Sequence, residues 1–182
     1  ISIFLLSGCW SYIGLDELTI VSGFAIDKDI QTGMYKLAFE IIDLNSSIKE
    51  KEPGSKIIES EGSTIFDAIR NCKKKISNKL YFGHAKVVIL SEYIAKNEDI
   101  SVLIDMLIRD EEGRENIYVV VSQEKTASDI LKAEGTDQTN ISFEITNIVG
   151  DDPKVTSSTS PLKLYEIYNI INNLVAQNKS VL

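Results

Sequence analysis

The sequence is poor in the residue types that carry metal and redox chemistry. Its 182 residues include one histidine and two cysteines. A single histidine, His84, excludes a metal site built from a histidine pair, and the chain has no Cys/His spacing of the kind that binds zinc. It also lacks a glycine-rich phosphate loop and a nucleophile elbow. We therefore expect no cofactor, no metal and no catalytic constellation.

Positive charge is also scarce. The formal net charge is -8, and the only dense basic cluster is Lys73-Lys74-Lys75. This balance lacks the basic footprint of nucleic-acid-binding proteins, so we expect no nucleic-acid partner. An acidic chain also repels anionic lipid headgroups, so electrostatic attraction would not hold it on a membrane.

Long apolar runs are missing, but a short one opens the chain. Ile1–Leu6 falls far short of the roughly 20 residues that a membrane-spanning helix needs, and it leads into Leu6-Ser7-Gly8-Cys9. This order is typical of a bacterial lipobox, in which small residues precede a cysteine that carries lipid on its sulfur. We interpret residues 1–8 as the end of a lipoprotein signal peptide and Cys9 as the lipidation site.

A thioether-linked diacylglycerol on Cys9 would bring two acyl chains, and stable anchoring takes two signals. The chain does not begin with Met, so we expect the upstream part of a precursor to be missing. In the alternative interpretation, Ile1–Leu6 is a buried strand and Cys9 an ordinary apolar cysteine.

Alternating hydrophobicity predicts an antiparallel hairpin with one face on a core. Its strands are Leu18–Asp27 and Met34–Asp43, joined by a polar turn that ends in Gly33. A polar loop follows, and Lys56–Ser60 is a candidate third strand. The residues expected on the core face are Leu18, Ile20, Phe24 and Ile26 in the first strand and Tyr35, Leu37, Phe39 and Ile41 in the second, the latter opposing Lys36 and Glu40.

A helix is predicted to begin after Thr64, because Thr64 and Asp67 form a capping-box pattern. Its apolar positions are Ile65, Ile69, Cys72 and Ile76, at helical spacing. This places the Cys72 thiol toward the core, where a thiol behaves as a small hydrophobe. The functional alternative is a reactive or pairing thiol.

Two apolar segments, Lys86–Leu90 and Ile117–Val121, are typical of central strands covered on both faces. Between them, Ile100–Ile108 has one apolar stripe at helical spacing. A strand, a helix and a strand in this order favour a right-handed crossover and a parallel pair. Thr126–Ala133 predicts another short helix, whereas Asn140–Val149 fits a helix or a strand.

Composition changes near Gly150. Residues 151–160 are polar and rich in Ser and Thr, and Ser160-Pro161 resembles the start of a helix. We predict an α+β fold in which helices pack on a mixed β-sheet over residues 9–150. Residues 151–182 are predicted to be a linker and the first helix of a further, incomplete domain.

Several sequence blocks occur together in an order that is typical of one family. They are Gly8-Cys9-Trp10, Asp16–Val21 continuing through Gly23 to Ala25-Ile26-Asp27, Glu61–Arg70, Phe82–Val87, Ile104-Asp105 with Arg109-Asp110, Tyr118–Val121 and Ala127–Leu131. From Gly8 to about Leu131, the chain resembles the C subunit of spore germinant receptors, a lipoprotein family of endospore-forming bacteria. Family members are longer and have several domains, so their C-terminal part is expected to be missing.

The resemblance implies a non-catalytic subunit of a receptor that triggers spore germination in response to nutrients. It implies integral membrane A-type and B-type subunits as partners and a position on the outer face of the spore inner membrane. The one residue whose role carries over by motif is Cys9. The alternative is a module that binds the small-molecule germinant itself, with Tyr12, Tyr81, Phe82 and Tyr118 as candidate pocket aromatics.

Three other residues are candidates for a role. His84 is expected to make structural hydrogen bonds as a buried imidazole, since catalytic use would need a partner within reach. Asp105 and Arg109, at i and i+4, are expected to form a surface ion pair. The alternative for this pair, with the charged turn that follows at 110–115, is docking of another subunit.

Overall fold

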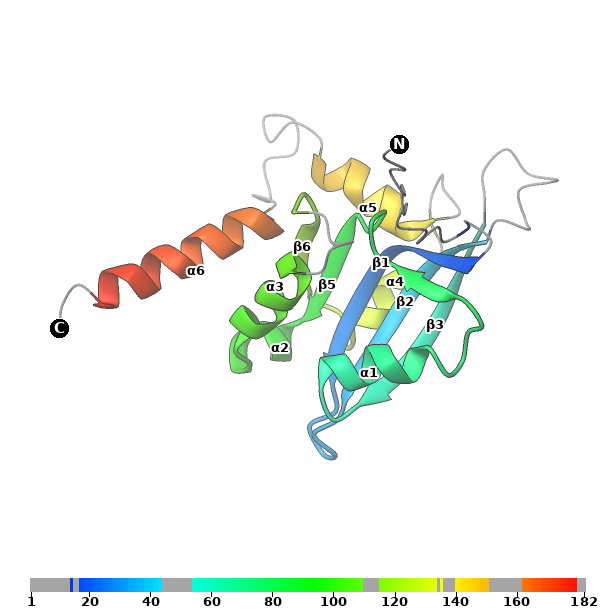
Figure 1. The fold of residues 1–182 in the computed structure, drawn as a ribbon, viewed down its shortest axis with the longest axis horizontal. Helices are drawn as coiled ribbons and strands as arrows, with labels where there is room; N and C mark the ends of the chain where they lie inside the picture. Colours follow the sequence, from blue (N-terminus) through cyan, green and yellow to red (C-terminus); the bar gives the residue numbers. More distant parts are fainter. Residues whose placement is uncertain are drawn as a thin grey trace, which may run out of the picture.

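The computed structural model describes residues 14, 17–43, 54–109, 115–133, 135, 140–150 and 162–179. Seven strands form one mixed sheet in the order β3-β2-β1-β5-β6-β7, and β4 pairs separately with β1. The strands are β1 (Leu18–Lys28), β2 (Tyr35–Asp43), β3 (Gly54–Gly62), β4 (Lys79–Tyr81), β5 (Val87–Ser91), β6 (Tyr118–Ser122) and β7 (Leu162–Lys163). The helices are α1 (Ile65–Cys72), α2 (Glu92–Asn97), α3 (Ile100–Arg109), α4 (Ala127–Leu131), α5 (Ile141–Gly150) and α6 (Leu164–Lys179). The predicted α+β class with a mixed sheet is confirmed (Figure 1).

The predicted hairpin is present, with β1 and β2 antiparallel, and β3 continues the sheet as a longer strand than predicted. The turn depends on Gly33, whose φ of 71° is left-handed. A bulge interrupts β1 between Val21 and Gly23. As a result Val21 joins Phe24 and Ile26 in the core, and the predicted period-two face does not continue to the start of the strand.

The predicted parallel crossover is also confirmed, because β5 pairs in parallel with both β1 and β6. All of β5 is buried. The prediction that β6 is equally central is wrong: Val121 is 52% exposed. Within the described residues, its outer neighbour β7 pairs with Tyr118 and Val119, and no strand pairs with β6 beside Val121.

Helices cover both faces of the sheet (Figure 1). On one face, α1, α2, α3 and the first turns of α6 pack on a core centred on Phe24, Phe39 and Phe82, whose rings lie within 6.1 Å of one another. On the other face, α4 and α5 pack on a smaller core that includes Ala25 and Ile89. The ambiguous segment 140–149 is therefore a helix, α5.

The start of the segment predicted as a further domain packs on this sheet. Leu164 is fully buried in the core. Its N–H donates to the carbonyl of Ile117 at 2.8 Å, and the Tyr165 N–H donates to Glu115 at 3.2 Å. The boundary near Gly150 stays a prediction.

Two carboxylates of the hairpin hold α4 and α5 on the second face. Glu40 is fully buried, and its two oxygens accept the N–H groups of Ile141 and Ser142, each at 2.8 Å. Asp27 accepts the N–H groups of Ala127 at 2.7 Å and Ser128 at 3.1 Å. Each carboxylate thus satisfies the first two free N–H groups of a helix and lies at the positive end of its dipole.

The third N–H of each helix is satisfied by the residue before the helix. Thr126 accepts from Asp129 N at 3.2 Å, and Asn140 accepts from Phe143 N at 3.1 Å. Gly23 lets α5 approach this closely, because a Cβ atom there would lie 2.2 Å from the Ser142 hydroxyl oxygen. The sequence pattern had placed Glu40 on a polar face, but α5 covers that face.

We predict that Glu40→Gln lowers the free energy of unfolding by about 2–4 kcal/mol, because the amide presents a donor where the α5 backbone and the Ser142 hydroxyl need an acceptor. The matched control is Glu59→Gln, which removes only an exposed ion pair with Lys132 and is expected to cost about 0–1 kcal/mol. Urea unfolding of both variants tests this, and equal losses would contradict the role given to Glu40.

Candidate functional site

An open groove of about 810 Å³ lies between the β1–β2 turn, the start of α1 and the α2–α3 segment. Its apolar walls come from Ile65 and Phe66 of α1, Ile94 of α2, and Ile100, Val102, Leu103 and Met106 of α3. Its charged lining residues are Lys28, Glu98, Asp99, Asp105 and Arg109. Such a combination of apolar walls and a few converging polar groups is typical of a binding site.

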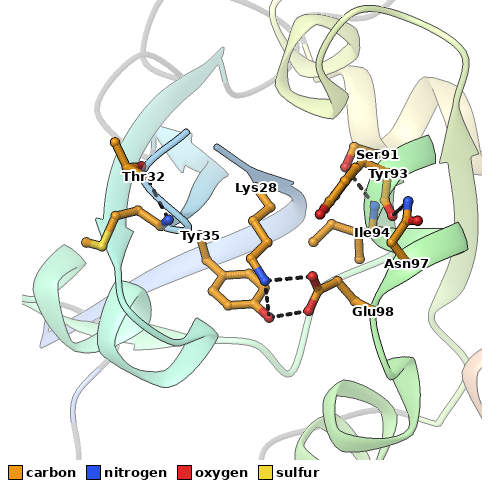
Figure 2. Close-up of polar contacts among 9 residues, drawn as sticks. Lys28, Thr32, Tyr35, Ser91, Tyr93, Ile94, Asn97 and Glu98 are labelled. Atoms are coloured by element: carbon orange, nitrogen blue, oxygen red, sulfur yellow. Dashed lines mark hydrogen bonds and ion pairs between the residues drawn. The ribbon is translucent and has the colours of Figure 1, made fainter. Parts of the chain in front are cut away.

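A polar triad of Lys28, Tyr35 and Glu98 links the hairpin to α2 along this groove (Figure 2). Lys28 Nζ donates to one Glu98 oxygen at 2.6 Å, and the Tyr35 hydroxyl donates to the other at 2.7 Å. The ammonium also lies 4.6 Å from the centre of the Tyr35 ring. Lys28 and Tyr35 are cross-strand partners in β1 and β2, so the sheet register sets the spacing between them.

Local helix chemistry places Glu98. Ser91 caps the start of α2 by accepting from Ile94 N, and the Glu98 N–H donates to Ile94 at 3.1 Å where the helix ends. The side chain of Glu98 then points toward the hairpin (Figure 2). The triad therefore fixes the hairpin end against α2.

The triad moves every one of its pKa values away from neutrality. The hydrogen bond with Glu98 raises the pKa of Lys28, while the bonds from Lys28 and Tyr35 lower the pKa of Glu98. Burial, followed by the bond to Glu98, raises the pKa of Tyr35. General acid–base catalysis needs pKa values near the working pH, so this arrangement suits a structural ion pair rather than a proton-transfer pair.

The residues singled out from the sequence do not converge on one site. The prediction that His84 is a buried, hydrogen-bonded imidazole is wrong, because the residue is exposed and its ring lies 5.6 Å from that of Tyr81. Phe82 packs between Phe24 and Phe39 in the core. Tyr81, Phe82 and Tyr118 are not among the groove residues, and Tyr12 lies outside the described residues.

The other candidates behave as predicted where the structure describes them. Cys72 is fully buried, and burial raises the pKa of its thiol, as expected for an inert core cysteine. Arg109 donates to Asp105 at 2.8 Å on the exposed side of α3. Cys9 lies outside the described residues, and so do residues 110–114 of the charged turn.

Within the part of the chain that the structure describes, no three His, Cys, Asp or Glu side chains gather in a way that could hold a metal ion. None of the helices in this part is both long enough and apolar enough to cross a bilayer.

The sequence alone does not reveal the groove, because its members come from three separate segments. In the sequence, Phe66 and Val102 are apolar residues outside the predicted core stripes. They are far apart along the chain, and no spacing pattern predicts that they lie on the same groove. The one signal was Asp105 with Arg109, which was assigned to a surface and does line the groove.

Comparison with known proteins identifies the family. The family described as "Spore germination protein N-terminal domain" matches residues 11–176. The chain belongs to this family. The resemblance to the C subunits of spore germinant receptors is thereby confirmed.

Three curated relatives from Bacillus subtilis (strain 168) support this assignment. Spore germination protein KC is 32% identical over 139 residues, which cover 72% of this chain and 34% of the relative. Spore germination protein B3 is 27% identical over 135 residues (73% and 36%), and spore germination protein A3 is 28% identical over 171 residues (90% and 44%). The chain thus spans less than half the length of these relatives. No solved structure matches it.

We predict that Lys28→Met raises the pKa of Glu98 toward its ordinary value near 4.5, because the main cause of its depression is lost. Since the folded-state pKa is depressed, the triad's contribution to stability is complete above that ordinary value. It is lost as the pH falls through the folded-state pKa.

Carbon-13 NMR titration of the glutamate carboxyl groups measures this shift. The control is Lys96→Met, which breaks the exposed i,i+4 pair with Glu92 and is expected to leave Glu98 unchanged. If the pKa of Glu98 is the same in wild type and in Lys28→Met, the triad is refuted.

Proposed function

We propose that this chain is the N-terminal part of a lipid-anchored, non-catalytic subunit of a spore germinant receptor. In this proposal it acts with integral membrane A-type and B-type subunits in nutrient-triggered germination, on the outer face of the spore inner membrane. The observation that carries the proposal is membership of the spore germination protein family over residues 11–176.

The lipobox pattern at Leu6–Cys9 supports the anchor. Cys9 precedes the start of β1 at Leu18 by nine residues. Nine extended residues span at most about 30 Å, so a lipid on Cys9 would keep the sheet close to the bilayer surface. The net charge of -8 does not favour attraction to anionic headgroups, so the lipid would provide the attachment.

The polar geometry supports a non-catalytic role. The buried or half-buried carboxylates of Glu40, Asp27 and Glu98 have their oxygens occupied by donors of the fold itself. His84 lies apart, exposed beside Tyr81. These groups stabilise helices and the hairpin, which suits a subunit that acts through contacts with other proteins.

Direct binding of the germinant is the alternative function, and the groove is its natural site by size, because small-molecule sites occupy about 300–1,000 Å³. Two features weigh against it. The polar groups of Lys28, Tyr35 and Glu98 are already bonded to one another. Phe66 and Val102 remain 60% and 69% exposed on its walls, whereas a small-molecule pocket buries most of its ligand.

We predict that Cys9→Ala in the full-length precursor abolishes incorporation of a tagged fatty acid and releases the protein from the membrane fraction. The reason is that two acyl chains are what hold such a protein on a bilayer. The control is Cys72→Ala, which removes the buried core thiol and is expected to keep full labelling. Labelling that persists without Cys9 would contradict the anchor.

A further inference from the structure

We propose that the groove between α1 and α3 docks an amphipathic α-helix of another polypeptide. That helix would present large apolar side chains on one face and a Lys or Arg beside them. This inference rests on the proposed role as one subunit of a complex, and it adds the surface through which the chain is held in that complex.

The two walls of the groove leave apolar surface uncovered. Phe66 on α1 is 60% exposed and Val102 on α3 is 69% exposed, and both line the groove. Paired large apolar side chains across a groove mark a site of protein interaction rather than ordinary surface. Each wall thus contributes an aromatic or aliphatic residue that the fold itself does not bury.

A second row of side chains on α3 faces the groove. Leu103, Ile104 and Leu107 form the stripe that packs on the core. Val102, Met106 and Arg109, at i, i+4 and i+7, line the groove. Met106 also packs partly against the core, whereas Val102 is 69% exposed. Val102 is thus the apolar side chain of this row that the described residues leave largely uncovered.

The groove is shared by two helices of this layer. On this face of the sheet, α1 lies toward β3 and α3 lies toward β6 (Figure 1). Ile65 and Phe66 of α1 and Val102 and Met106 of α3 line the same groove. A helix laid in it would therefore contact side chains of both α1 and α3.

The charge of the groove favours one kind of partner. Lys28 is paired with Glu98, and Arg109 is paired with Asp105. Asp99 also lines the groove, and its carboxylate accepts the N–H of Ser101 at 2.9 Å but has no cation paired to it in the described ranges. The uncompensated charge of the groove is thus negative, which favours a basic residue on the incoming helix.

Photo-crosslinking in the full-length protein, in its native membranes, tests the proposal. A photo-reactive amino acid replaces Val102, and the control replaces Ile148 of α5, which is 59% exposed on the opposite side of the sheet. We expect the Val102 position to capture a peptide from a different polypeptide, with apolar residues at helical spacing next to a Lys or Arg. The Ile148 position is expected to capture no such peptide.

Substitutions then test whether the contact holds the complex together. Val102→Asp and Phe66→Asp place a charge on each wall, and each is expected to lower recovery of the captured partner about tenfold or more, as for a central interface residue. Ile148→Asp is the matched control and should leave recovery unchanged. Asp99→Asn, which keeps the acceptor for Ser101, should weaken recovery in a salt-dependent way. Circular dichroism confirms that each variant is folded.

Three outcomes would overturn the groove proposal while leaving the proposed function intact. They are equal recovery for wild type and the wall variants, a crosslink to a second copy of this chain, and protection of Val102 by a small germinant with no captured peptide. If wild-type protein recovers no partner at all, the proposed function fails and the groove proposal fails with it.

Discussion

The fold depends on carboxylates that extend from the central hairpin to the starts of two helices. Glu40 and Asp27 each accept the first two N–H groups of a helix, α5 and α4 respectively. The cap residues Asn140 and Thr126 accept the third. Burying a carboxylate is costly unless its oxygens are bonded, and here the same bonds remove the cost of the unpaired helix ends. These hydrogen bonds thus fix the position of both helices on the sheet.

The capping of α4 and α5 by these two carboxylates could not be predicted from the sequence. Glu40 alternates with apolar neighbours as a solvent-facing residue would, and only the distant segment at Asn140–Ser142 turns that face into an interior. The hairpin, the crossover and the capped helix at Thr64 were predictable because each depends on residues close in sequence. The bulge at Ser22, the exposure of β6 and the identity of α5 were not, because each depends on pairing or packing with a remote segment.

The same distinction separates the candidate residues. Cys72 was placed correctly because helical spacing alone determines which face it occupies. His84 was placed wrongly, because the loop before β5 carries its ring to the surface beside Tyr81, and no periodicity describes that loop. The groove joins the hairpin turn, α1 and α2–α3, so it exists only once the sheet order has brought these segments together.

α6 is held at its base and projects beyond the sheet. Leu164 is fixed in the core and the adjoining β7 is bonded to β6, while Ile170 and Leu174 further along are about half exposed. Sixteen residues make a helix of about 24 Å, and it extends away from the sheet (Figure 1). Its first turns also pack on the core and against α3. A displacement of its far end would therefore be carried to α3 and the β6 edge together.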